Sequence, residues 1–127
     1  MDINQINERI KQLNIEDFIW IIYIGIIGLS FISNNYERKY FLYKNEYDKK
    51  KYLKITITIF SILIVVYLYF LKDAVDSLKK LKPNTNKKTS KLTYLSFIAS
   101  LLIAISGFIY LYIAFADEDL NVEIAFN

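Results

Sequence analysis

The sequence predicts an all-α integral membrane protein with three hydrophobic helices in a small bundle and an amphipathic helix at the N-terminus. Three uncharged apolar runs indicate this fold: residues 18–33, 55–71 and 92–116. The third run would reach about 38 Å as a helix, more than the ~30 Å hydrocarbon core of a bilayer. With 54% hydrophobic and 17% aromatic residues, the chain of 127 residues is more apolar than an ordinary soluble domain.

The first residues carry an apolar stripe with helical spacing: Ile3, Ile6, Ile10 and Leu13. This stripe predicts an amphipathic helix over residues 1–14. Such a helix lies in the membrane interface or docks on a partner, and the pattern fits equally well a helix packed on this protein's own bundle. Asn14, followed by Glu16 and Asp17, is typical of a helix start, so a new helix is expected over residues 15–43.

Turn-forming residues and charges define the remaining elements. A charged, Tyr-rich connection follows the first run, and the second helix is expected over residues 47–82, where Pro83 ends it. After a polar loop, the third helix is expected over residues 90–116, with Thr89 or Ser90 as its cap. Residues 117–127 form an acidic tail, for which a frayed end is favoured over a strand that adds to a partner's sheet. The chain 1–127 is expected to be one membrane domain.

Small residues recur at helical spacing within two of the apolar runs, and they predict close helix–helix contact, because small side chains let backbones approach in lipid. Packing within the three-helix unit is favoured for most of these positions, and docking on a second copy or a larger partner is the alternative. The expected packing residues are Gly25, Gly28, Ser96, Ser100, Ala104 and Gly107.

Lysines flank the apolar runs and are expected to contact anionic lipid head groups: Lys49, Lys50, Lys51, Lys87, Lys88 and Lys91. With three spans and a cytoplasmic N-terminus, the inner segments hold 9 Lys and Arg residues against 7 outside. This narrow margin favours a multi-pass protein of the cell (plasma) membrane with its N-terminus cytoplasmic and its C-terminus outside. The same counts leave open that residues 55–71 do not cross, or that the chain inserts in both orientations.

The composition argues against catalysis. The chain has no Cys and no His, so it lacks the usual thiolate nucleophile, the commonest general base and the commonest transition-metal ligand. Its 3 Gly residues cannot build a Gly-rich phosphate loop. No catalytic residue, cofactor site or metal site is therefore expected, and no nucleic-acid partner. The apolar runs contain no ionisable group other than Tyr, whereas pumps and voltage sensors place acids or bases inside the span.

These exclusions favour a non-enzymatic small membrane protein of bacterial type. We expect an accessory, regulatory or immunity-type subunit that acts through helix packing with a larger membrane partner, an expectation that rests on architecture alone. The alternative is a self-assembling pore-forming or membrane-permeabilising (holin-like) protein. The two expectations share the lipid bilayer and differ in the partner, which is a larger membrane protein in the first and the protein itself in the second.

Overall fold

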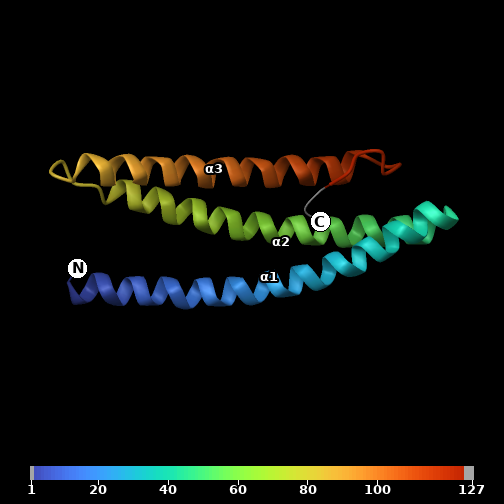
Figure 1. Ribbon diagram of the computed structural model, residues 1–127, viewed down its shortest axis with the longest axis horizontal. Coiled ribbons are helices and arrows are strands. Elements are labelled where there is room, and N and C mark those ends of the chain that lie inside the picture. The colour runs from blue at the N-terminus through green and yellow to red at the C-terminus, as the bar shows by residue number, and fades with distance from the viewer. Residues whose placement is uncertain (1, 125–127) are drawn as a thin grey trace. The chain divides into compact units, whose positions relative to one another are not determined.

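The computed structural model describes residues 2–124, which form three long helices and no strand. Helix α1 spans Ile3–Tyr43, α2 spans Glu46–Lys79 and α3 spans Lys87–Ala116 (Figure 1). The predicted all-α class with three long apolar helices is confirmed, and each helix is long and apolar enough to cross a membrane. The chain divides into two compact units, one ending at Tyr52 and the other beginning at Leu53.

Helix α1 begins with a capping box. The Asp2 carboxylate accepts a hydrogen bond from the Gln5 backbone N–H at 2.8 Å, and the Gln5 side-chain oxygen accepts one from the Asp2 N–H at 3.0 Å. The amphipathic segment is present as the first turns of this helix, and the expected break at Asn14 does not occur. Arg9 pairs with Glu16 at 3.4 Å, so an ion pair spans the expected boundary. With no Pro or Gly in this stretch, the backbone ladder continues into the apolar run.

The first unit reverses its chain direction in two residues. Lys44 has a left-handed backbone conformation (φ 52°), and its N–H donates to the carbonyl of Tyr40 at 2.7 Å, which ends α1. The side-chain oxygen of Asn45 accepts from the N–H of Tyr47 at 2.9 Å and so caps α2, which begins at Glu46. The sequence predicted this turn within one residue.

In the second unit, α2 and α3 form an antiparallel hairpin, green and orange in Figure 1. Helix α2 ends at Lys79, three residues before the expected end at 82. A turn over residues 82–85 follows, with a hydrogen bond from the Thr85 N–H to the Lys82 carbonyl at 3.0 Å. The Asn86 side chain then accepts from the Lys88 N–H at 2.7 Å and caps α3, so α3 begins at Lys87 instead of 90.

Two contacts set the register of this hairpin. A Cβ built on Gly107 would lie 3.0 Å from Cδ2 of Tyr67, and the rings of Phe60 and Tyr110 stack with centroids 5.4 Å apart. Counting from these contacts, the apolar run of α3 extends about eight residues, on the order of 12 Å, beyond Leu71, the last residue of the apolar run of α2. The two runs end together at the other end of the hairpin, where Lys54 and the acidic residues 117–119 follow them.

The described part of the tail is organised by one carboxylate. The two oxygens of Asp117 accept hydrogen bonds from the backbone N–H groups of Asn121 at 3.0 Å and Val122 at 2.6 Å. Ile124 is buried. The expected frayed end is therefore a turn up to residue 124, while residues 125–127 lie outside the described part of the chain.

Candidate functional site

Gly107 lies closely against α2. An added Cβ would lie 3.0 Å from the Tyr67 ring and 3.2 Å from Cγ1 of Ile64, which is tighter than ordinary van der Waals contact. Ala104, one turn earlier on α3, is buried as well. Gly107 therefore packs against α2 within the second unit, and both residues are buried.

The small-residue stripe continues where the sequence analysis did not extend it. Ala114 is buried, at a spacing of seven residues from Gly107. At the other end of the stripe, Ser96 is exposed and Ser100 is half-buried. The stacked pair of Phe60 and Tyr110 was also not predicted, because only the antiparallel register brings these two rings together. The spacing 104, 107, 114 was the signal that could have found Ala114.

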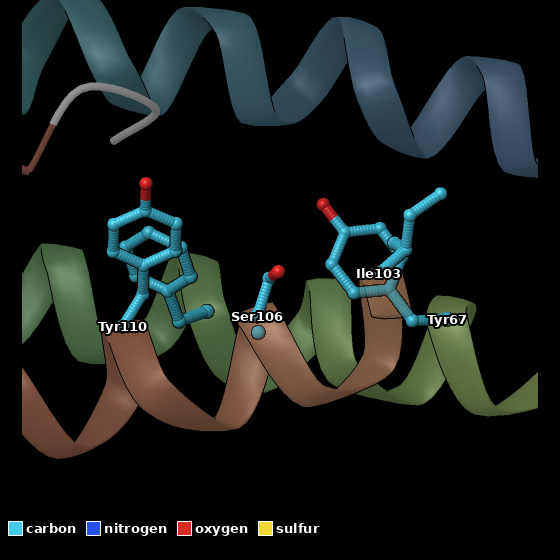
Figure 2. Close-up of a pocket in the computed structure, with 6 residues that line it drawn as sticks. Tyr67, Ile103, Ser106 and Tyr110 are labelled. Atoms are coloured by element: carbon cyan, nitrogen blue, oxygen red, sulfur yellow. The ribbon is translucent and has the colours of Figure 1, made fainter. Parts of the chain in front are cut away.

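A cleft of about 360 Å³ lies beside this contact on the α2–α3 hairpin. Figure 2 shows the hydroxyl groups of Tyr67, Ser106 and Tyr110 directed to the same side. The Ser106 hydroxyl already donates to the Leu102 carbonyl at 2.9 Å. Apart from these hydroxyl groups, the walls of the cleft are apolar or aromatic. The cleft therefore suits a hydrocarbon chain or an apolar side chain better than a polar substrate. The lining residues are Phe60, Tyr67, Ile103, Ser106, Gly107 and Tyr110.

Gly25 and Gly28 are placed very differently from Gly107. A Cβ added at either position would meet no atom within 4 Å, and both residues are exposed. At about 3.6 residues per turn, they share one side of α1 with four exposed apolar side chains. We call this surface the glycine face of α1: Ile21, Ile24, Gly25, Gly28, Phe31 and Ile32.

The glycine face lies opposite the buried side of its own helix. The buried residues of the apolar run are Ile19, Ile26 and Ser33, which recur every seven residues. Gly28, at the centre of the glycine face, is about half a turn away from this buried stripe. Within the described chain, the glycine face is therefore an uncovered apolar surface with a shallow notch where two side chains are missing.

Two of the three lysines expected at head groups in the first connection are engaged within the protein. Lys49 pairs with Glu46 at 3.2 Å, its Nζ lies 5.7 Å from the centroid of the Tyr40 ring, and its side chain is only 15% exposed. Lys51 lies 5.6 Å from the centroid of the tyrosine four residues earlier. Only Lys50 is exposed and makes no ion pair or ring contact with other described residues.

The lysines at the start of α3 have the opposite character. Lys87, Lys88 and Lys91 are all exposed, and none makes an ion pair or ring contact with another residue in the range 2–124. Their ammonium groups are available to an external anion. Leu92, Tyr94 and Leu95, which follow directly on α3, are also exposed.

The described residues contain no group of three His, Cys, Asp or Glu side chains that could hold a metal ion. In comparisons with protein-family models, with curated proteins and with solved structures, nothing matches this chain. Its surfaces must therefore be interpreted from its own residues. Two of them have a defined chemistry: the apolar glycine face of α1 and the lysines at the α2–α3 turn.

Proposed function

We propose that this chain is a multi-pass membrane protein without enzymatic activity, an accessory, regulatory or immunity-type subunit that acts by packing on a larger membrane partner. The observation that carries this proposal is the glycine face, an exposed apolar surface on which a Cβ added at either glycine would meet no neighbouring described residue within 4 Å. The absence of His and Cys from the sequence supports a role in binding over one in catalysis.

The exposure of the apolar runs supports membrane insertion. In the most apolar window of each helix, only 11% of α1, 33% of α2 and 17% of α3 is buried. In water, so much exposed apolar surface would drive aggregation, whereas lipid chains cover it without cost. Helix α2 is unbroken from Glu46 to Lys79, which supports a crossing over a re-entrant segment, because a re-entrant segment must reverse within the membrane.

The proposed orientation places the N-terminus and the α2–α3 turn in the cytoplasm of a bacterial cell and the C-terminus outside. Because the chain has no Cys, single cysteines report the sidedness directly. Tyr43→Cys and Asn84→Cys leave the caps Asn45 and Asn86 intact and place a probe at each end of α2. A membrane-impermeant thiol reagent added to intact cells should label the first variant and spare the second. Protection of both would mean that α2 does not cross.

A partner helix is the occupant that best fits the glycine face. Helices associate in lipid through close van der Waals contact, and small residues three or four positions apart permit that contact. Gly25 and Gly28 have this spacing, and Ile24 and Phe31 supply ridges on either side of the notch. Lipid chains alone would cover the face but would gain nothing from the notch.

The test uses the full chain, purified in mild detergent from its native host. The double variant Gly25→Leu/Gly28→Leu fills the notch and should abolish recovery of one specific larger membrane protein, while the stability of the chain is not reduced. Ser96→Leu is the matched control, since Ser96 is also an exposed small residue within an apolar run. Loss of the complex with Ser96→Leu and not with the double variant would contradict the proposal.

Two differently tagged copies of the chain, expressed together, distinguish self-assembly from binding to another protein. The proposal predicts that one tagged copy does not recover the other once the larger partner has been removed. Recovery of the second copy, together with loss of membrane potential on overexpression, would instead support the self-assembling pore.

A further inference from the structure

We propose that the α2–α3 end of the second unit is a docking surface for anionic phospholipid head groups, and that the α1–α2 end is not. This inference rests on the proposed membrane insertion. The inference goes beyond membrane insertion because it assigns selectivity for anionic lipids to one end of the chain. The surface is the lysine end: Lys79, Lys82, Lys87, Lys88 and Lys91, all exposed.

The lysine end has few counter-charges. Residues 77–91 hold 6 Lys residues and no carboxylate, and the nearest acids, Asp73 and Asp76, precede them on α2. By contrast, residues 37–54 hold 7 Lys and Arg residues together with Glu37, Glu46 and Asp48. Two of those lysines are also held by a carboxylate or by aromatic rings, as described above for Lys49 and Lys51. The two ends carry similar numbers of cations, but Lys87, Lys88 and Lys91 make no ion pair or ring contact with another described residue, whereas Lys49 and Lys51 do.

The position of the lysines on α3 increases the need for an anion. Lys87 and Lys88 occupy the first turn of the helix, and no acidic residue lies in that turn. The N-terminal end of a helix carries a partial positive charge, so cations there raise the local electrostatic energy. An anionic partner relieves both the repulsion among the lysines and the interaction with the helix dipole.

The register of the hairpin identifies the anion as a lipid head group. The apolar run of α3 extends about eight residues beyond that of α2, so exposed Leu92 and Leu95 lie near the level of the charged last turns of α2. Exposed apolar and cationic side chains are thus mixed at one depth, as at the boundary between acyl chains and phosphates. A nucleic acid would satisfy the lysines and leave the leucines and Tyr94 in water.

A site-specific fluorescence experiment tests this assignment. The full chain carrying a fluorophore at Asn84→Cys is reconstituted in nanodiscs of phosphatidylcholine and phosphatidylglycerol with identical chains. Quenching by nitroxide-labelled phosphatidylglycerol is compared with quenching by the labelled phosphatidylcholine. We expect the anionic lipid to quench about fivefold more strongly, the factor that one lysine near an anionic surface supplies, and expect the ratio to fall as salt is raised.

Two triple variants remove the same charge from opposite ends. K87Q/K88Q/K91Q removes three of the five lysines of the lysine end and should lower the quenching ratio toward one. R38Q/K50Q/K54Q changes three exposed cations at the other end that have no ion pair among the described residues, and it should leave the ratio unchanged. Equal loss in both variants would mean that only net charge matters, and a ratio near one in the parent protein would overturn the inference.

The outcomes also separate this inference from the proposed function. A chain that inserts into the nanodisc but shows no lipid preference contradicts the docking surface alone. A chain that does not insert contradicts both. Helix content measured by circular dichroism confirms that each variant is folded before its quenching ratio is compared.

Discussion

Gly107 and the pair Gly25 and Gly28 are the only glycines of the chain, and the structure places them in opposite environments. Gly107 is buried, and its missing side chain is what allows the Tyr67 ring and Ile64 to approach. Gly25 and Gly28 face open space on an apolar helix surface. The contrast teaches that a small residue in an apolar run indicates a place where close packing is permitted, while the tertiary structure decides whether the chain itself uses it.

The largest expected effect comes from Gly107→Leu. The new Cβ would lie 3.0 Å from the Tyr67 ring and 3.2 Å from Cγ1 of Ile64, so both side chains must shift to admit it and the bulk that follows it. We expect a loss of about 3 kcal/mol in the free energy of unfolding, since overpacking forces side chains and backbone to shift. Unfolding in mixed micelles with increasing SDS measures it. Gly25→Leu is the matched control and should be at least as stable as the parent protein, because the new Cβ meets no neighbour and leucine is the better helix former. An equal loss in both variants would remove the contrast.

Phe60→Ala tests whether the close packing between α2 and α3 extends beyond Gly107. Phe60 is 1% exposed and stacks on Tyr110. We expect a loss of about 2 kcal/mol in the free energy of unfolding, mostly from the cavity, because lipid offers no hydrophobic driving force for its burial. The same SDS titration measures this effect. Phe31→Ala, on the exposed glycine face, should cost much less, and a comparable cost there would mean that this face is covered in the folded protein.

Gly107→Ala should be a milder form of the first variant. A single methyl group at 3.0 Å from Cδ2 of Tyr67 requires the ring to move by a few tenths of an ångström. The expected cost is about 1 kcal/mol in the free energy of unfolding. An additional Tyr67→Phe change leaves the ring in place and should not rescue it, whereas Tyr67→Leu should recover part of the loss. Full tolerance of Gly107→Ala would show that the ring moves aside freely.

Gly28→Ala is expected to have the smallest effect, and it should stabilise the chain where the preceding variants destabilise it. Nothing lies within 4 Å of the added methyl group, and alanine is the better helix former. We expect the free energy of unfolding to rise by about 0.5 kcal/mol, measured in the same titration. If the glycine face binds a partner helix, the variant should weaken that complex although the isolated chain is more stable. Destabilisation of the isolated chain would place Gly28 in an internal contact.

Some boundaries were predictable and others were not, for local reasons. The end of α1 was expected at Tyr43 and is found there. The start of α3 was expected at 90 and is found at Lys87. Several cap-forming residues follow Pro83, and Asn86 is the one that caps the helix because it directly follows the turn over residues 82–85. At Asn14, a residue type that commonly caps a helix lies inside one, because no Pro or Gly interrupts the backbone hydrogen bonds there.

The residues of the candidate surfaces could be predicted from the sequence, but their burial and their contacts could not. The six small residues and six lysines were found from their spacing and charge. Ala104 and Gly107 turned out to be internal, while Gly25 and Gly28 are open. Lys49 and Lys88 were both expected at lipid head groups, yet one is held by Glu46 and Tyr40 and the other is exposed. Spacing along a helix reports which residues share a side, but it contains no information about what faces that side.

By itself, the sequence determined the all-α fold class. It contains three uncharged runs of helical length, and such runs must satisfy their backbone hydrogen bonds internally wherever water is absent. The composition also argued against catalysis that depends on His or Cys, and against pumps and voltage sensors, which need charged groups within the span. Only the tertiary structure decided the register of α2 against α3, and with it the packed and open glycines and the offset between the two apolar runs. Register depends on how side chains such as Phe60, Tyr67 and Tyr110 interlock across two helices, a property of pairs of residues that no single position along the chain carries.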